Sequence, residues 1–230
     1  MICLIDICCG EVPTFKAALW LGLAGCIPAF GQFSPISTPT PIYTGATTLI
    51  PITAADRTAV TSLKKGAQTI TLSTSFSTAT VPGLDWGTWG SPPNTESSTP
   101  RILGYYDPIT SVTLTLSLPA TTFGFEIEPD SDSVFPINVN YYNGSTLLGT
   151  VSRNVSGDAG ALLVAASSIT PITSVVITIS SDAFGFAMAQ FRYATVSAVP
   201  TLSTAALGAL GLLLAGAGVL LARGQRIAGA

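Results

Sequence analysis

The sequence predicts an all-β protein with an antiparallel β-sandwich as its main domain, and three observations support this class. Charged residues make up only 9% of the chain, a low fraction for solvated helices. Apolar and hydroxyl side chains alternate with a period of two through the middle of the sequence, where no segment has a helical period. Gly, Pro, Asn or Asp bounds each alternating run. The expected strands are 58–63, 68–74, 112–118, 121–128, 137–142, 146–151, 161–165, 174–180 and 184–193.

A hairpin and an internal repeat support the sandwich. Asn143-Gly144 predicts a type I′ turn, because both central positions of that turn need a positive φ. Segment 108–117 is matched by segment 171–180, and each is followed by Phe-Gly-Phe, at 123–125 and 184–186. We therefore expect one supersecondary unit to occur twice. Two facing sheets would bury its apolar rows, with each Phe-Gly-Phe placing its aromatic rings on one face and its glycine where another backbone approaches closely. The rows are Val112, Leu114, Leu116 and Val175, Ile177, Ile179.

The first 31 residues have the features of a signal peptide. Lys16 precedes the apolar segment 17–24, and Ala29-Phe30-Gly31 places small residues before Gln32. Because the preceding residues contain acidic side chains, a later start at Val12 is one alternative. Cys26, which ends a Leu-Ala-Gly-Cys sequence, is also a candidate for lipidation.

The C-terminal region predicts a transmembrane helix over 202–222. This segment has no charged residue, and its 21 residues span about 31 Å as a helix, enough to cross a hydrocarbon core of about 30 Å. Arg223 and Arg226 follow it and would stop transfer on the cytoplasmic side. The domain before the helix is therefore expected to be exported.

The end of the chain resembles the sorting tails of bacterial exosortase substrates. Val199-Pro200-Thr201-Leu202, the apolar helix and the basic end together match the PEP-CTERM class, and most closely its IPTL-CTERM variant. The resemblance implies a sorting signal over 199–226, a membrane location and an exosortase-like processing enzyme as partner. β-Sandwich domains that carry such tails are jelly-roll-like, which implies the same architecture for segment 103–193. The alternative is a plain single-pass anchor with a proline at its first turn.

Composition limits the chemistry of the region between the two signals. Segment 32–51 is rich in Ser, Thr and Pro and predicts a linker or an edge segment, and 52–195 is the expected sandwich domain. All four cysteines lie in the first 26 residues, and the chain has no histidine. A disulfide framework, a Ser-His-Asp triad and a His-ligated zinc site are therefore not expected in the domain. With six basic and ten acidic residues between Gln32 and Pro200, no nucleic-acid partner is expected either.

Four alternating carboxylates form the first candidate site. Glu126, Glu128, Asp130 and Asp132 share one strand face or the turn after it, and oxygen ligands at this density predict a possible calcium site. No other cofactor is expected. A solvated strand end is the alternative explanation. A glycosidase would need two carboxyl groups across a cleft, which neighbours on a single strand do not define, so no enzyme is expected.

Four aromatic residues form the second candidate site. Trp86, Trp89, Tyr105 and Tyr106 lie in or beside the long Gly- and Pro-containing segment 81–101. Exposed rings on such a loop would stack on sugar rings. Alternatively, the rings cap an open end of the sandwich and are buried there.

These features predict an exported, membrane-tethered or sortase-like-processed surface protein with a structural, adhesive or matrix-associated role. The alternative is a carbohydrate-binding module or a weak glycoside hydrolase, with extracellular polysaccharide as its partner.

Overall fold

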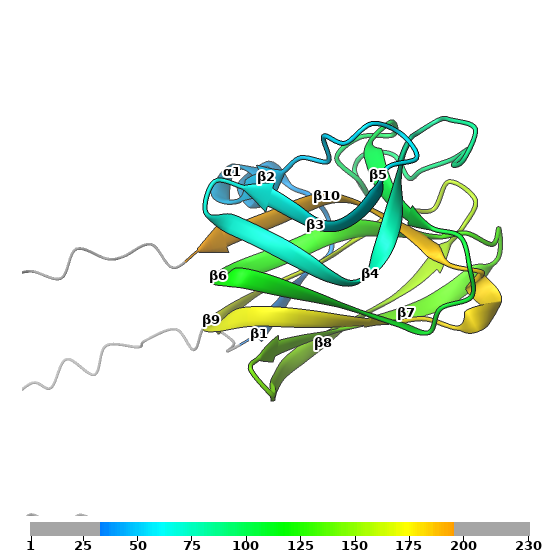
Figure 1. Cartoon of the computed structure of the whole chain (residues 1–230). Helices are drawn as coiled ribbons and strands as arrows, with labels where there is room; N and C mark the ends of the chain where they lie inside the picture. Colours follow the sequence, from blue (N-terminus) through cyan, green and yellow to red (C-terminus); the bar gives the residue numbers. More distant parts are fainter. Residues whose placement is uncertain (1–32, 196–230) are drawn as a thin grey trace, which may run out of the picture. The chain divides into compact units, whose positions relative to one another are not determined.

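The structure, a computed structural model, describes residues 33–195 (Figure 1). The expected signal peptide over 1–31 and the sorting tail over 199–226 lie outside these residues. Within 33–195, none of the helices has the length and apolar character that a membrane crossing requires.

The described residues form ten strands and two short helices, and all strand pairings are antiparallel. The all-β, antiparallel prediction is confirmed. The strands are β1 (Phe33–Ile36), β2 (Thr48–Ile50), β3 (Ala59–Lys65), β4 (Gln68–Thr80), β5 (Arg101–Tyr105), β6 (Ser111–Pro129), β7 (Val134–Asn143), β8 (Thr146–Ser156), β9 (Leu162–Thr178) and β10 (Phe186–Thr195). The helices are α1 (Pro41–Ala46) and the 3₁₀ turn η1 (Ser181–Ala183).

The two long strands β6 and β9 pair with each other and connect two layers of one hydrogen-bonded sheet. Their register shifts between Thr115 and Thr122, where Pro119 of β6 and Pro171 of β9 interrupt the ladder. The first layer contains β3, β4, the first half of β6, the second half of β9, β7 and β8. The second layer contains β5, β2, β10, the rest of β6 and β9, and β1. The two facing sheets predicted from the sequence are therefore present as two layers of one continuous sheet, because bent strands run through both layers (Figure 1).

The repeated segments lie side by side instead of facing each other. Val112 pairs with Ile177 and Leu114 pairs with Val175 in the β6–β9 ladder. Both apolar rows are buried, as expected, but they line the same side of one layer. The second layer covers this side with Phe123, Phe125 and other large side chains, and together they form the main core.

The two Phe-Gly-Phe sequences differ in structure. Phe123 and Phe125 are both buried, whereas Phe184 is 58% exposed, so the expectation that both rings of the second sequence share one face is wrong. Both glycines do lie where another backbone approaches: a Cβ on Gly124 would collide with Ala165, and one on Gly185 with the Tyr105 carbonyl.

The hairpin between β7 and β8 is present, but its turn lies one residue later than expected. Asn143 pairs with Thr146, so the central residues are Gly144 and Ser145. Gly144 has a φ of 56°, and Ser145 is not among the residues with positive φ. The turn therefore has its glycine at the first central position, as in type II′, and the type I′ prediction is wrong.

Segment 32–51 is structured from residue 33 onward, which overturns the linker interpretation. β1 pairs with β9 and β2 pairs with β10, so the edge-segment alternative fits. Thr40 caps α1 between them by accepting a hydrogen bond from the Tyr43 N–H, and Pro41 begins the helix. Phe33 and Thr195, the first and last described residues, lie at the same end of the domain (Figure 1).

The outer face of the second layer is covered, and this positions the candidate site. The segment between β4 and β5 packs Trp86 and Trp89 onto small side chains of this face, including Ala187 and Ala189 of β10. Tyr43 of α1 packs beside it on Leu163 and Ala165 of β9. Two segments distant in sequence therefore cover neighbouring parts of this face.

Candidate functional site

A hollow of about 570 Å³ lies where α1, the 81–100 segment and β10 meet. Its volume is within the usual range for small-ligand sites, about 300–1,000 Å³. Proline rings and threonine hydroxyls dominate its walls, and one arginine and one glutamate are its charged residues. The lining residues are Thr38, Pro39, Thr40, Pro41, Thr44, Pro92, Pro93, Thr95, Glu96 and Arg192.

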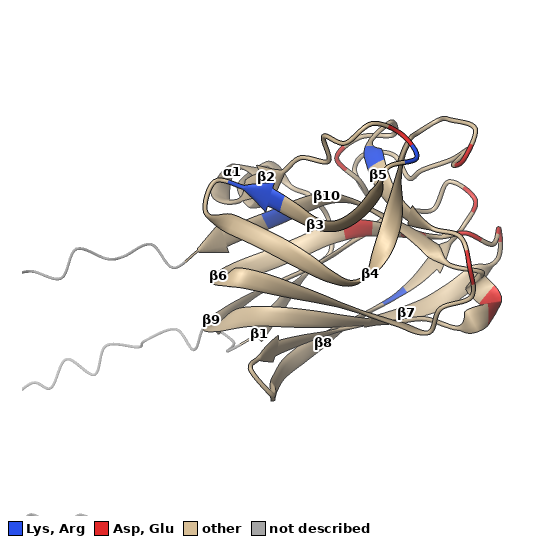
Figure 2. Ribbon diagram, in the orientation of Figure 1, with Lys and Arg blue, Asp and Glu red and all other residues tan. Residues whose placement is uncertain are grey.

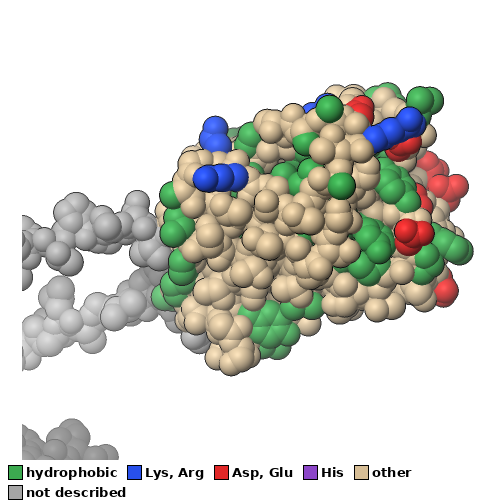
Figure 3. All heavy atoms as spheres, in the orientation of Figure 1, with side chains coloured by type: hydrophobic (Ala, Val, Ile, Leu, Met, Phe, Trp, Pro, Cys, Tyr) green, Lys and Arg blue, Asp and Glu red, His purple; other side chains and the backbone are tan. Residues whose placement is uncertain are grey.

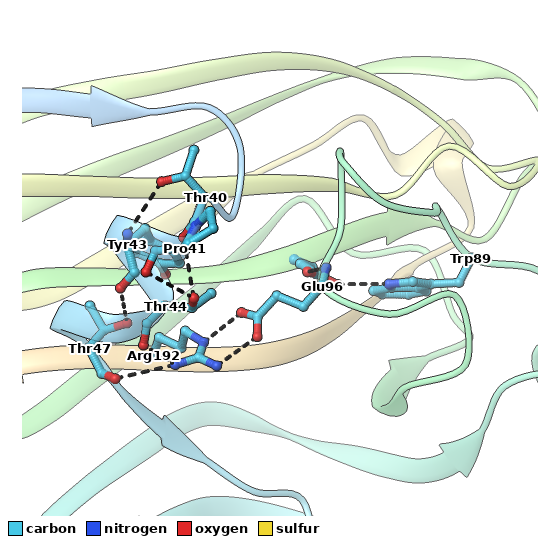
Figure 4. A network of polar contacts seen from close by, with 9 residues as sticks. Thr40, Pro41, Tyr43, Thr44, Thr47, Trp89, Glu96 and Arg192 are labelled. Carbon is cyan, nitrogen blue, oxygen red and sulfur yellow. Dashed lines mark hydrogen bonds and ion pairs between the residues drawn. The ribbon is translucent and has the colours of Figure 1, made fainter.

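Arg192 and Glu96 form a two-pronged ion pair at this hollow (Figure 4). Arg192 Nε donates to Glu96 Oε1 at 2.6 Å, and Nη2 donates to Oε2 at 2.7 Å. Each side chain is 13% exposed, so the pair is largely shielded from water. A bulge at Gln190, which has a φ of 51°, sets the register that turns Arg192 to the outer face of β10.

The same guanidinium joins α1 to the sheet. Arg192 Nη1 donates to the carbonyl oxygens of Thr44 at 3.0 Å and Thr47 at 3.3 Å, at the C-terminal end of α1. A cation at this end of a helix satisfies carbonyls that have no intrahelical partner. Four of the five N–H groups of Arg192 are used in these bonds, which leaves one on Nη2 for a ligand.

Buried contacts behind the hollow fix Glu96. Its backbone N–H donates to Glu126 Oε1 at 2.5 Å, and the indole N–H of Trp89 donates to Glu126 Oε2 at 3.0 Å. Glu126 has no exposed surface. The two oxygens of this carboxylate on β6 thus hold segment 81–100, here called the covering segment, in place. They thereby also fix the orientation of Glu96.

Glu128 forms a second anchor of the same kind two residues along β6. Trp86 Nε1 donates to Glu128 Oε2 at 2.9 Å, and the Gly160 N–H donates to Oε1 at 3.0 Å. Burial raises the pKa of Glu128 to about 7, and burial also raises the pKa of Glu126 to about 7, although the indole hydrogen bonds oppose both shifts. The two carboxylates are therefore sensitive to pH near neutrality.

The two predicted sites come together, but not with the expected exposure. Trp86 is 5% and Trp89 is 4% exposed, so neither ring offers a sugar-stacking surface, and the alternative that the rings are buried holds for both. They are buried under the covering segment on the outer face of a layer, not at an open end. Tyr105 is half-buried, and Tyr106 is 37% exposed with its ring centre 5.9 Å from that of Trp86.

The four carboxylates separate into two pairs. Glu126 and Glu128 are buried, so the solvated-strand interpretation is wrong for them, because N–H donors replace water there. Asp130 is half-buried and Asp132 is exposed in the turn that follows β6. Within the described part of the chain, no three acidic side chains cluster closely enough to hold a metal ion. Calcium binding by these residues stays a prediction.

Two smaller hollows lie around Arg57, which forms an exposed two-pronged ion pair with Asp85 at 2.9 and 3.0 Å. Their volumes are about 260 and 240 Å³, and Tyr105 and Tyr106 line the second. Because Arg57 has 66% of its side chain exposed, this pair is screened by water, unlike the pair formed by Arg192.

Glu96 and Arg192 were not identified from the sequence. One signal for Arg192 was present, because it is the single charged residue in the otherwise mostly apolar strand 184–193 after Asp182. A charge in such a strand indicates a buried partner. Glu96 lies in an irregular segment, where no periodicity shows which way a side chain points.

No family model and no curated protein matches the sequence. Among solved structures, the chain is similar to a family 6 carbohydrate-binding module from Clostridium stercorarium in complex with cellobiose, at 17% identity, 51% coverage of this chain, 86% of that chain and a TM-score of 0.27. It is similar to the enzymatically active domain of bacteriophage CBA120 tailspike protein 4, at 14% identity, 56% and 19% coverage and a TM-score of 0.31. It is also similar to a family two carbohydrate esterase from Cellvibrio japonicus, at 13% identity, 57% and 37% coverage and a TM-score of 0.26.

Proposed function

We propose that this chain is an exported bacterial surface protein whose β domain binds sugar residues of an extracellular polysaccharide in the hollow beside Arg192. Its N-terminal segment directs export, and its C-terminal tail tethers it to the membrane or is processed by an exosortase-like enzyme. The domain is a jelly-roll-like module with an adhesive or matrix-associated role. Export rests on the composition of the two terminal segments, and binding rests on the geometry of the hollow.

The observation that supports binding is the pairing of Arg192 with Glu96 at the hollow. A guanidinium N–H and carboxylate lone pairs lie side by side there, so that neighbouring hydroxyls of one sugar could donate to Glu96 and accept from Arg192. The threonine hydroxyls of the wall add both donors and acceptors, and the four proline rings supply rigid apolar surface. This mixture suits a polyol better than an apolar or strongly charged ligand.

Binding is favoured over hydrolysis by the number of carboxylates. A glycosidase uses two carboxyl groups on opposite sides of the bond that it cleaves. Among the residues that line the hollow, only Glu96 is acidic, and both its oxygens accept hydrogen bonds from Arg192. Glu126 and Glu128 are buried beneath the covering segment.

A filled hollow tests the proposal. Thr38 lines the hollow, and Arg192 bonds to Glu96, Thr44 and Thr47 and not to Thr38, so Thr38→Trp should fill the space and leave the Arg192 network intact. We expect a soluble oligosaccharide that binds the native protein on a glycan array to lose at least tenfold in affinity to this variant by calorimetry. Leu84→Trp, at a site 96% exposed, is the matched control and should bind normally. Equal affinity in both variants, or no oligosaccharide bound by the native protein, would exclude the hollow as a sugar site.

Export is tested separately. An alkaline phosphatase reporter inserted after Thr195 should be active in cells, because that enzyme matures only outside the cytoplasm. An inactive alkaline phosphatase fusion together with an active β-galactosidase fusion at the same position would rule out the exported arrangement, whatever the domain binds.

A further inference from the structure

The central part of the outer face of the first layer, here called the neutral face, carries uncharged polar side chains apart from one tyrosine and one valine. It is opposite the buried rows of the core and spans β4, β6, β9, β7 and β8. Its residues are Thr69, Thr71, Ser73, Ser111, Thr113, Thr115, Ser117, Asn138, Asn140, Tyr142, Thr150, Ser152, Ser174, Val176 and Thr178. All of them are exposed or half-buried.

These side chains form rows that cross the strands. One row runs from Ser111 through Thr178 and Asn138 to Ser152, and the next runs from Thr113 through Val176 and Asn140 to Thr150. Neighbouring strands lie about 4.8 Å apart, and alternate residues along a strand lie about 6.7 Å apart. The neutral face is therefore a repeating array of hydroxyl and amide groups.

Contacts within the array fix the orientation of its amides. Thr150 Oγ1 donates to Asn140 Oδ1 at 2.7 Å, and Ser152 Oγ donates to Asn138 Oδ1 at 2.6 Å. Each amide oxygen is occupied by a neighbour, so the amide nitrogens remain as donors beside hydroxyls that can accept. The array can therefore both donate and accept hydrogen bonds at regular intervals.

No charged residue belongs to the neutral face, although Lys64 of β3 borders it. Most charged side chains lie instead on the connecting segments and around β5 and β10 (Figure 2). The space-filling view shows an extended area without charged or large hydrophobic side chains at the centre of the domain (Figure 3). Of the large exposed hydrophobic residues, Val134 of β7 and Leu147, which pairs with Tyr142, lie at the border of the face, whereas Ile42, Leu84 and Phe184 lie on other segments.

These properties select one kind of partner. An anionic polymer or lipid surface would be recognised by basic residues, and a protein interface has aromatic, Arg or other large anchors at its centre. A neutral polysaccharide carries no charge and offers closely spaced hydroxyl groups, which can pair with the donors and acceptors of the array. Threonine methyls, Val176 and the Tyr142 ring supply apolar contacts for the faces of its sugar rings.

We infer that the neutral face docks onto the surface of an insoluble, uncharged polysaccharide such as cellulose, chitin or a β-glucan. This inference deepens the proposed function, because it names the class of polysaccharide and adds a second contact surface to the hollow. The array covers roughly 20 Å by 15 Å, less than half of the area that a standard interface buries on each partner, about 800 Å². Binding therefore depends on an immobile polymer that offers many equivalent sites.

Charge placed on the face tests the inference. Ser111 and Thr115 are exposed on β6, between β4 and β9 in the face, and lie on either side of Thr113. In pull-down assays of the full chain with cellulose, chitin and curdlan, the double variant S111K/T115K should lose at least tenfold in the fraction retained on the polymer that the native protein binds. S111E/T115E should lose as much, because a neutral polymer does not distinguish the sign of the charge. Far-ultraviolet circular dichroism and melting temperature establish that each variant is folded.

The hollow variant separates the two proposals. Thr38→Trp should keep its retention on insoluble polymer, while the face variants should keep their affinity for soluble oligosaccharides. Retention that is lost in Thr38→Trp and kept in both face variants would overturn the inference and leave the hollow as the binding site. Retention lost in only one of the two charge variants would indicate a charged partner, and a change in sedimentation with the face variants would indicate a second copy of the chain. Each of these two results overturns the inference. The inference is also overturned if the native protein is not retained on any of the three polymers.

Discussion

The indole N–H of Trp89 donates to Glu126 Oε2 at 3.0 Å, which joins the covering segment to a strand 37 residues away in sequence. The other oxygen of Glu126 accepts from the Glu96 N–H, so one buried carboxylate holds both sides of the turn that contains Pro92 and Pro93. Trp86 and Glu128 repeat the arrangement. These two buried carboxylates therefore hold the segment that forms one wall of the hollow.

Replacing this carboxylate should loosen the covering segment. Glu126→Gln keeps the size of the side chain but turns an NH₂ group toward one of the two N–H donors, which leaves that donor without an acceptor. An unsatisfied buried donor costs about 1–3 kcal/mol, so the free energy of unfolding in urea should fall by that amount. Asp132→Asn, on an exposed carboxylate of the turn after β6, should change it by less than about 0.5 kcal/mol. Equal effects of the two substitutions would contradict the anchoring role.

The domain should become more stable as the pH falls from 8 to 5. Glu126 and Glu128 each have a pKa raised to about 7 in the folded state, whereas an unfolded glutamate titrates near its ordinary value of about 4.3. The folded state therefore binds more protons between these values, and stability decreases with rising pH across that window. Melting temperatures measured at half-unit pH steps should show this slope. The variant E126Q/E128Q is less stable at every pH but should have a much flatter profile; an unchanged slope would assign the dependence to other groups.

Two glycines should differ sharply in their tolerance of a methyl group. Gly185 has a φ of 115°, and a Cβ there would collide with the Tyr105 carbonyl of the neighbouring strand. Gly144 also has a positive φ, 56°, but a Cβ there meets nothing within 4 Å. Gly144→Ala should cost about 1 kcal/mol of unfolding free energy, from backbone strain alone. Gly185→Ala should cost more than twice as much, since β5 or β10 must also move. Comparable chemical denaturation curves for the two variants would argue against the β5–β10 packing.

The two arginine ion pairs should respond differently to a conservative change. Arg192 bonds to Glu96 and to two helix carbonyls with 13% of its side chain exposed, and lysine cannot reproduce this fork. Arg192→Lys should lower the free energy of unfolding by about 1–3 kcal/mol, because lysine keeps the charge but leaves at least one of these acceptors without a donor. Arg57→Lys affects a pair whose arginine is 66% exposed and should stay within about 0.5 kcal/mol. The midpoints of urea unfolding of the two variants measure this difference. A larger decrease in the free energy of unfolding for Arg57→Lys than for Arg192→Lys would contradict the prediction.

Much of the strand content could be predicted from the sequence, because alternation of buried and exposed residues has a period of two. The runs 112–118 and 121–128 were recognised as strands, but they form the single bent strand β6. Alternation shows the face of each residue and not the direction of the chain, so it cannot distinguish two strands from one strand that bends at Pro119. β5 was missed because Arg101–Tyr105 is short and lacks clear alternation.

The candidate site was predictable only in its parts. Alternation placed Glu126 and Glu128 on the same face of one strand, which the structure confirms, and the long segment with Trp86 and Trp89 was also recognised. Nothing in either pattern shows that the segment folds back over that face. This depends on long-range contacts, including the bond from the Glu96 N–H to Glu126, which no local rule encodes.

The chain enters the domain at Phe33 and leaves it at Thr195, and both residues lie at the same end (Figure 1). The position of these two residues determines which turns lie at the opposite end. Asp130, Asp132, Asp158 and Asp182 lie in the turns at the opposite end, where Figure 2 shows acidic side chains gathered. A protein held at a surface by either end of its chain would thus point an anionic tip away from that surface. Neighbouring copies would repel one another through these tips at low ionic strength and crowd more closely as salt screens them, within a range of about 10 Å at 0.1 M.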